Sequence, residues 1–126
     1  MMLLDTHVFL WYVLADPGLS ESALCKIQTS DRVFVSIASF WEMAIKSSLG
    51  KLKLPVSVPE LMELCVSGGF EILQIRPSHL QTLEELPWIH RDPFDRLIVA
   101  QARAEGLELA TEDSCVRRYD VKTAEL

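Results

Sequence analysis

The sequence lacks any apolar run of the length that a membrane helix needs, which is about 20 residues. Hydrophobic residues make up 49% of the chain, but charged and polar residues divide them into short segments. The first residues, Met1 to Asp5, lack a basic segment and reach an acid at once, so we expect no signal peptide. The 126 residues suffice for one core, and we expect a single cytoplasmic domain over residues 1–126 with no membrane contact.

Cysteine is also scarce. Cys25, Cys65 and Cys115 are widely spaced, and no two of them form a Cys-x-x-Cys pair. An odd number of cysteines without such a pair argues against a disulfide framework and against a zinc site. We therefore expect three reduced, mostly buried thiols.

Basic residues are outnumbered, with 12 Lys and Arg against 18 Asp and Glu and a formal net charge of −6. This balance argues against indiscriminate binding to nucleic acid, although it does not exclude a nucleic-acid substrate. Four acids gathered at one site would account for four of the six excess negative charges. A cation bound there would offset part of their charge.

Short apolar runs alternate with helix-spaced patterns along the chain. We expect strands over 2–5, 33–35, 70–75 and 107–111 and an edge strand over 121–124. Helices are expected over 8–14, 20–29, 36–48, 59–66, 78–86 and 93–105, and a short helical turn over 113–117. Residues 51–55 are expected to form an extended piece or a loop. This alternation predicts a three-layer α/β/α sandwich around a central, mostly parallel sheet of four or five strands.

The stretch around Asp95 carries the strongest helix signals. Asp92 suits the N-cap, Pro93 suits the first helical position, and Asp95 falls in the first turn. Gly106 is expected to end the helix. A carboxylate is thus predicted at a helix start that lies just before a strand.

Three further acids lie at similar junctions: Asp5 ends the first strand, Glu42 lies on the helix after the second, and Asp113 follows the fourth. Capping is an alternative role for each. Asp5 and Asp113 can cap their own helical turns, and the spacings from Ser39 to Glu42 and from Asp92 to Asp95 fit capping boxes.

Two observations favour a shared site over capping. Glu42 lies among apolar neighbours, and a buried charge is costly unless it is paired or binds a metal. In addition, ligands of open parallel sheets bind beyond the carboxyl ends of the strands, where the acids are expected to converge. Mg²⁺ or Mn²⁺ would relieve the repulsion between such carboxylates. A site of this kind suits phosphodiester hydrolysis by a metal-activated water, and the hydroxyls of Thr6, Ser36 and Thr111 could orient water or metal ligands or serve the turns.

Four segments together resemble the PIN domain (PilT N-terminus), and the resemblance runs nearly from end to end. They are Leu3-Leu4-Asp5-Thr6-His7, the stretch from Val35 to Lys46 with its Trp41-Glu42 pair, His90-Arg91-Asp92-Pro93-Phe94-Asp95-Arg96, and Leu109-Ala110-Thr111-Glu112-Asp113. The second and third are also similar to small bacterial toxins of the VapC type.

That resemblance implies a magnesium- or manganese-dependent endoribonuclease in a type II toxin–antitoxin pair. It further implies a homodimer and a cognate antitoxin whose C-terminal segment covers the acidic site. Carried over by position, Asp5, Glu42 and Asp95 match the three core acids of the family, and Asp113 matches a fourth.

The neighbours of these acids have less defined roles. Asp92 is expected to be an N-cap or to support the site from behind. Arg96 and Lys46 are each expected to contact phosphate or to pair with a site acid. His7 and His90 are interpreted as structural or as facing the substrate, because this chemistry requires no general base.

Two other functions stay open at this point. An aspartate-dependent phosphatase also uses an Asp at the end of its first strand, but it typically needs a second Asp two residues on, where this chain has His7. A catalytically silent interaction module of the same fold would need no cation. The sequence does not indicate which RNA would be cut, because base recognition depends on loops.

Overall fold

The computed structural model describes residues 1–124 and 126. Its centre is a five-stranded sheet in the order β3-β2-β1-β4-β5, and every neighbouring pair of strands is parallel. The strands are β1 (Met2–Leu4), β2 (Val33–Ser36), β3 (Glu71–Leu73), β4 (Glu108–Ala110) and β5 (Thr123–Ala124). The predicted parallel sheet is therefore confirmed, including the edge position of the last strand.

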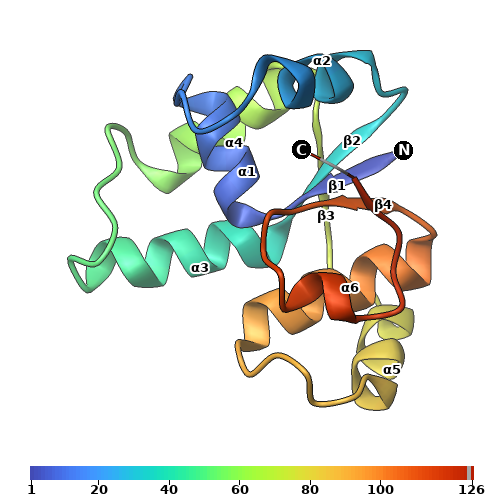
Figure 1. The fold of residues 1–126 in the computed structure, drawn as a ribbon. Helices are drawn as coiled ribbons and strands as arrows, with labels where there is room; N and C mark the ends of the chain where they lie inside the picture. Colours follow the sequence, from blue (N-terminus) through green and yellow to red (C-terminus); the bar gives the residue numbers. More distant parts are fainter. Residues whose placement is uncertain (125) are drawn as a thin grey trace.

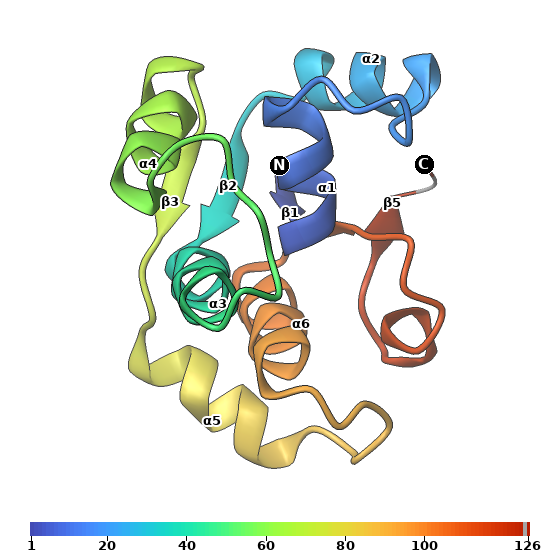
Figure 2. The ribbon, with the colours of Figure 1, turned by 90° about the vertical axis from the view of Figure 1, so that its left-hand side faces the viewer.

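Helices cover both faces of this sheet (Figures 1 and 2). One face carries α1 (Thr6–Val13), α2 (Glu21–Thr29) and α4 (Val58–Ser67), and the other carries α5 (Pro77–Glu85) and α6 (Pro93–Glu105). Helix α3 (Ile37–Ser48) extends away from the end of β2 and contacts α1, α4 and α6. A short 3₁₀ turn, η1 (Val116–Arg118), follows β4. The three-layer sandwich matches the prediction.

The core is divided by the sheet into two clusters, and successive strand residues alternate between them. Met2 and Leu4 pack with α1, α2 and α4, whereas Leu3 packs with α6. In the same way, Val35 belongs to the first cluster and Phe34 contacts the second. Strands buried on both faces are expected of a parallel sheet between helices, and they explain why the strand segments are almost entirely apolar.

Side-chain caps define the helix starts. The side chains of Asp5, Ser36 and Asp92 accept backbone N–H bonds at the starts of α1, α3 and α6. Gly106 ends α6 with a φ of 66°, a conformation that glycine adopts at little cost. The caps at Asp5 and Asp92 fix where α1 and α6 begin, next to the acids that the sequence predicts to converge.

Several boundaries and one burial prediction need correction. Cys25 is exposed, so the expectation of mostly buried thiols holds fully only for Cys65. The third strand is only three residues long, the turn after β4 lies at 116–118, and residues 51–55 form a loop. Among the described residues, the structure contains no helix that is long and apolar enough to cross a membrane.

The topology creates one natural crevice. From β1 the chain adds β2 and β3 on one side and then returns to place β4 and β5 on the other. Such a reversal in strand order leaves a gap at the carboxyl ends of the strands, where ligands of open parallel sheets bind. The gap here lies between the ends of β1 and β4, at Asp5 and Thr111.

Candidate active site

Asp5 leaves β1 directly into the crevice. Its backbone N–H bonds to the carbonyl of Ala110 at 3.1 Å, which extends the pairing with β4 by one residue. Its carboxylate Oδ1 accepts the N–H of Val8 at 2.8 Å and so caps α1. Burial raises the pKa of Asp5, although hydrogen bonds from Thr111 and Val8 oppose the rise. The capping prediction is thus confirmed, and it is compatible with a second role, because Asp5 also lines a cavity.

Asp113 faces Asp5 across the crevice from the segment after β4. The cavity of about 250 Å³ that Asp5 lines is also lined by Asp95 and Asp113. Asp113 Oδ1 accepts the N–H groups of Cys115 and Val116, at 2.8 and 3.2 Å. Burial alone would raise the pKa of Asp113, but the hydrogen bond from His90 and these two backbone bonds lower it below its ordinary value. Asp113 is therefore held as an anion.

Asp95 is the least compensated acid of the cluster. It lies in the first turn of α6, and burial together with the negative charge of Asp92 raises its pKa to about 7. The nearby charges of Glu42 and Asp113 act in the same direction, whereas His90 opposes them. A carboxyl group that is destabilised by like charges in this way is suited to a bound cation, which would favour the ionised form.

Glu42 lies beside this cavity rather than on its wall. It is 3% exposed, and its two oxygens are already paired: Thr6 Oγ1 lies 2.7 Å from Oε1, and Lys46 Nζ lies 2.6 Å from Oε2. Its predicted burial and its pairing with Lys46 are confirmed. The capping-box alternative for Glu42 is wrong, because Ser36 caps α3 and Glu42 lies in the second turn.

His90 joins two of the acids. Its Nε2 lies 3.0 Å from Asp113 Oδ2 and 3.2 Å from Asp95 Oδ2. Its Nδ1 accepts the backbone N–H of Asp92 at 3.0 Å, so the proton of the neutral ring is on Nε2 and points at the carboxylates. Although the ligand atoms of His90, Asp113 and Cys115 lie within 4.8 Å of one another, this tautomer makes His90 a hydrogen-bond donor rather than a metal ligand.

The sequence placed His90 near the site without giving it this central role. Its position two residues before an N-cap was the available signal. The ring reaches back to the backbone of Asp92 and thereby turns its second nitrogen toward Asp95. Asp92 itself caps α6 through Phe94 and Asp95, as predicted, but Asp95 pairs with His90 instead of completing the predicted capping box.

The three predicted hydroxyls all have structural partners at the carboxyl edge. Ser36 Oγ accepts the N–H of Ala38 at 3.1 Å. Thr111 Oγ1 accepts the N–H of Asp113 at 3.0 Å and bonds to the carboxylate of Asp5. Thr6 has one hydroxyl hydrogen and uses it on Glu42, so the neighbouring Ser39 hydroxyl at 2.9 Å must be the donor to Thr6. Thr6 thus orients Glu42 and Thr111 orients Asp5, whereas Ser36 caps α3.

Arg96 lies outside the cluster, contrary to the prediction that it contacts phosphate or a site acid. It is 4% exposed, and it donates to the carbonyls of Pro87, Leu83 and Leu86 and to the hydroxyl of Tyr119. Helical periodicity explains the difference, because consecutive residues on a helix point about 100° apart. Arg96 therefore faces the end of α5 while Asp95 faces the crevice.

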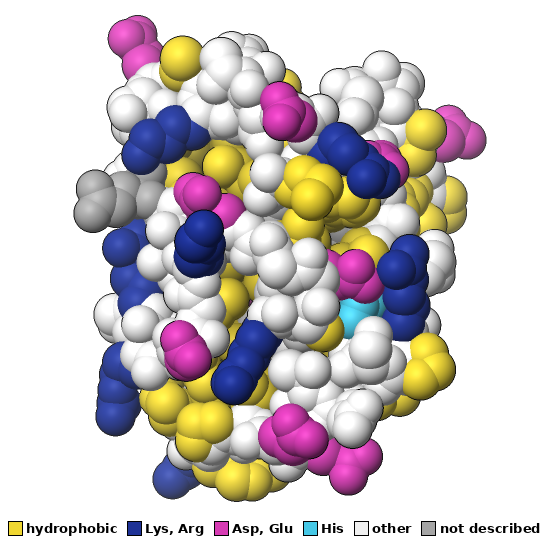
Figure 3. Space-filling view, turned by 90° about the vertical axis from the view of Figure 1, so that its right-hand side faces the viewer, with side chains coloured by type: hydrophobic (Ala, Val, Ile, Leu, Met, Phe, Trp, Pro, Cys, Tyr) yellow, Lys and Arg dark blue, Asp and Glu magenta, His cyan; other side chains and the backbone are white. Residues whose placement is uncertain are grey.

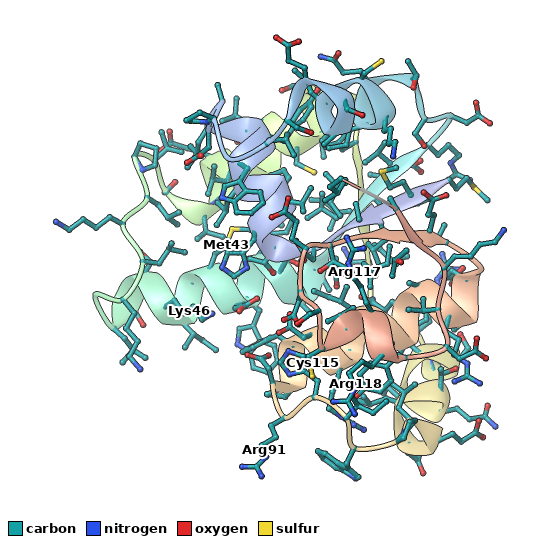
Figure 4. The ribbon with its side chains drawn as sticks, in the orientation of Figure 1. Met43, Lys46, Arg91, Cys115, Arg117 and Arg118 are labelled. Atoms are coloured by element: carbon teal, nitrogen blue, oxygen red, sulfur yellow. The ribbon has the colours of Figure 1, made fainter. Side chains whose placement is uncertain are left out.

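The residue set fits a hard divalent cation. Asp5, Asp95 and Asp113 offer carboxylate oxygens at one cavity, which are the ligands that Mg²⁺ and Mn²⁺ prefer, and the raised pKa of Asp95 marks uncompensated negative charge there. Cationic side chains come from three elements around these acids. Lys46 lies on α3, Arg91 lies on the loop before α6, and Arg117 and Arg118 lie on η1 (Figure 4).

The opposite end of the sheet differs in character. Figure 3 shows that side of the molecule, where Lys and Arg side chains are interspersed with Asp and Glu. Arg32 and Glu71, for example, pair at 2.6 Å. The fold and the cluster at the carboxyl edge together define the class: a single-domain parallel α/β protein with a cluster of acids at a topological switch point.

The family follows from comparison with known proteins. The family model of the PIN domain matches residues 2–122, so the chain belongs to the PIN domain family, as its motifs predicted. A curated relative, Ribonuclease VapC22 of Mycobacterium tuberculosis (strain ATCC 25618 / H37Rv), is 30% identical over 119 residues, which cover 94% of this chain and 91% of the relative.

Solved structures support the same fold. The VapBC2 complex from Rickettsia felis, bound to a DNA fragment from its promoter, contains a chain that matches with a TM-score of 0.73 at 18% identity, over 98% of this chain and 96% of that one. DNA-bound VapBC from Salmonella typhimurium matches with a TM-score of 0.68 at 17% identity, over 98% and 96% of the two chains. FitAcB from Neisseria gonorrhoeae matches with a TM-score of 0.66 at 19% identity, over 99% of this chain and 97% of that one.

Proposed function

We propose that this chain is a Mg²⁺- or Mn²⁺-dependent endoribonuclease and the toxin of a type II toxin–antitoxin pair. The single observation that carries the proposal is the convergence of Asp5, Asp95 and Asp113 on one cavity at the carboxyl edge of a PIN-domain sheet. The relative named as a ribonuclease supports RNA as the substrate.

The proposed roles of the residues follow from their contacts. Asp5, Asp95 and Asp113 would hold the cation, with Glu42 beside them as a fourth acid whose charge Lys46 balances. His90 holds Asp95 and Asp113 at a fixed separation through its Nε2–H. A bound divalent cation would make a water acidic enough to attack near neutral pH and would stabilise charge on the phosphate oxygens.

The test is cleavage of a structured RNA by the purified chain with Mg²⁺ or with EDTA. Asp5→Asn is the informative variant, because asparagine retains the N-cap bond to Val8 while the charge is lost. Asp31→Asn is the matched control, since Asp31 is exposed. We expect metal-dependent cleavage by the native chain and by the control, and loss of cleavage in Asp5→Asn.

Equal cleavage by all three proteins, or cleavage that persists in EDTA, would contradict the proposal. A catalytically silent interaction module would bind its partner without any cation and would cleave nothing. A phosphatase would act on phosphomonoesters and leave the RNA intact.

We extend the proposal to two partners. Two structural neighbours are VapBC complexes, which supports a cognate antitoxin. The family resemblance supports an antitoxin whose C-terminal segment covers the acidic site, and it supports a homodimer. Expression of the native chain alone should stop growth, whereas Asp5→Asn should be tolerated. Growth arrest by both chains would show that toxicity does not depend on the acidic site.

A further inference from the structure

A second cavity lies next to the start of α6 and has a different chemistry from the acidic site. It has a volume of about 370 Å³ and is lined by Leu83, Glu84, Trp88, Arg91, Pro93 and Arg96. Its walls are mainly apolar, and three charged groups lie around them. This combination is typical of sites that bind a small, flat, partly polar group.

Trp88 forms an exposed and rigidly supported wall of this cavity. It is 80% exposed, yet the guanidinium carbon of Arg96 lies 3.8 Å from the centre of its ring. Arg96 is itself fixed by backbone carbonyls from the end of α5. One face of the indole is thus supported by a cation, and a ring so exposed can receive a second flat group on its other face.

The charges at the rim indicate what that group is. Arg91 is exposed, and in the part of the chain that the structure describes it forms no ion pair. It can therefore bind a phosphate. Glu84 also lines the cavity and offers carboxylate oxygens to N–H donors. An aromatic face, a cation and a carboxylate complement an unpaired nucleobase with its backbone phosphate.

The position of the cavity connects it to the acidic centre. Pro93 lines the cavity and Asp95 lines the acidic site, and both lie in the first turn of α6. Arg91 projects from the loop before α6, on the side of the molecule that also carries Lys46 (Figure 4). A strand of RNA whose phosphate is at the acids would therefore pass this cavity within a few nucleotides.

We propose that this cavity, hereafter the Trp88 pocket, binds an unpaired base of the RNA substrate close to the cleavage point. The base stacks on Trp88, its N–H donors bind Glu84, and its phosphate binds Arg91. Guanine fits best, because its Watson–Crick edge presents two adjacent N–H donors to one carboxylate. The proposal rests on the ribonuclease function and adds base preference to it.

The test measures binding of short single-stranded RNAs to the uncleaving Asp5→Asn protein, by fluorescence anisotropy. Oligomers that contain one guanine or none are compared. Trp88→Ala should weaken binding of the guanine oligomer by about tenfold, in line with the loss of one stacked base, and Trp88→Phe should retain most of the affinity. Glu84→Gln should reduce the difference between the two oligomers, and Leu64→Ala, another exposed apolar residue, is the matched control.

Separate outcomes address the pocket and the nuclease. If the native chain cleaves RNA and Trp88→Ala binds RNA as well as the unsubstituted chain, the proposed base-binding role of the pocket is wrong. The proposed nuclease activity would be unaffected. A change in sedimentation with unchanged RNA binding would assign Trp88 to a contact between copies of the chain and would also overturn the pocket. The native chain could instead bind guanine selectively through Trp88 and show no metal-dependent cleavage. That result would support the pocket and contradict the proposed nuclease activity.

Discussion

Asp95 and Arg96 are adjacent in the sequence at the start of α6, where Arg96 is buried and Asp95 is partly buried, yet their surroundings carry opposite charge. Arg96 donates hydrogen bonds to carbonyls at and after the end of α5 and to the Tyr119 hydroxyl, and it packs on the face of the Trp88 ring. Asp95 lies near other acids, and its burial together with the charge of Asp92 raises its pKa to about 7. A buried charge with complementary partners is compatible with a stable fold, whereas a partly buried charge beside like charges is typical of a functional site.

The two surroundings are physically connected. The Tyr119 hydroxyl lies 3.4 Å from Arg96 Nη1 and accepts the backbone N–H groups of Ile89 and His90, at 3.1 and 2.8 Å. His90 then donates toward Asp95 and Asp113. The contact between Arg96 and Tyr119 therefore helps to hold the loop before α6, and this loop places His90 against Asp95 and Asp113.

The largest effect should come from Asp95→Asn, which separates activity from stability. We expect RNA cleavage to fall at least ~100-fold, comparable to the loss of a main electrostatic group in other active sites. The free energy of unfolding should rise in the absence of metal, because a destabilised charge is removed. Cleavage rates and thermal melts of the same preparation measure both.

A variant that was both inactive and less stable would contradict this contrast. It would show that Asp95 supports the fold as Arg96 does.

Arg96→Met should have the opposite pattern. Removal of the guanidinium leaves carbonyls at the end of α5 without their donor, and we expect the free energy of unfolding to fall by about 2–4 kcal/mol. Urea denaturation measures this change. Some cleavage at low temperature should persist at high RNA concentration, because Arg96 does not reach the acids, although RNA affinity should fall because Arg96 supports the ring of Trp88.

Arg103→Ala provides the control on the same helix, because Arg103 is exposed. Equal stability of Arg96→Met and Arg103→Ala would show that the carbonyl contacts of Arg96 contribute nothing.

The pH dependence of stability should sharpen the comparison further. The pKa of Asp95 is about 7 in the folded chain against an ordinary value of 3.8 for an aspartate, so between these values the folded state binds more protons than the unfolded state. Stability without metal should therefore fall as the pH rises from about 4 to 7, by about 1–3 kcal/mol from this group. Melting curves across this range measure the slope.

Asp95→Asn should flatten that slope while leaving the contributions of other groups unchanged. An identical slope in the native chain and in the variant would assign the pH dependence elsewhere.

The smallest effect is expected for Lys46→Met. Lys46 is partly exposed, with 39% of its side-chain surface accessible, which weakens the pair. Glu42 is buried, however, and would lose one of its two partners, so the substitution should cost about 1–2 kcal/mol. Chemical denaturation measures it, with the exposed Lys53→Met as control. A loss as large as that of Arg96→Met would place the Glu42–Lys46 pair among the main stabilising contacts.

The sequence predicted most of the fold for a definite reason. Apolar runs, caps and Gly106 are local signals, and the structure confirms the helix over Pro93–Glu105 with both of its ends. One topological rule about parallel sheets predicted that Asp5, Glu42, Asp95 and Asp113 gather at one edge. Asp5, Asp95 and Asp113 line one cavity there, whereas Glu42 lies beside it. The family resemblance added the order of the motifs.

Contacts between distant residues could not be predicted in the same way. The direction of Arg96 depends on where the end of α5 lies, and the role of His90 depends on a backbone bond to Asp92 and on Tyr119, which is 29 residues away. The Trp88 pocket likewise joins a loop to two helices. Such sites emerge from packing and leave no periodic pattern in the sequence.

The central claim, that Asp5, Asp95 and Asp113 form one cation site, is tested most directly by titrating Mn²⁺ or Mg²⁺ at pH 7 while the melting temperature is recorded. The native chain should become more stable as the cation concentration rises, because only the folded state assembles the site. Asp95→Asn should start higher and respond far less. An equal rise in both proteins, or none in the native chain, would contradict the account.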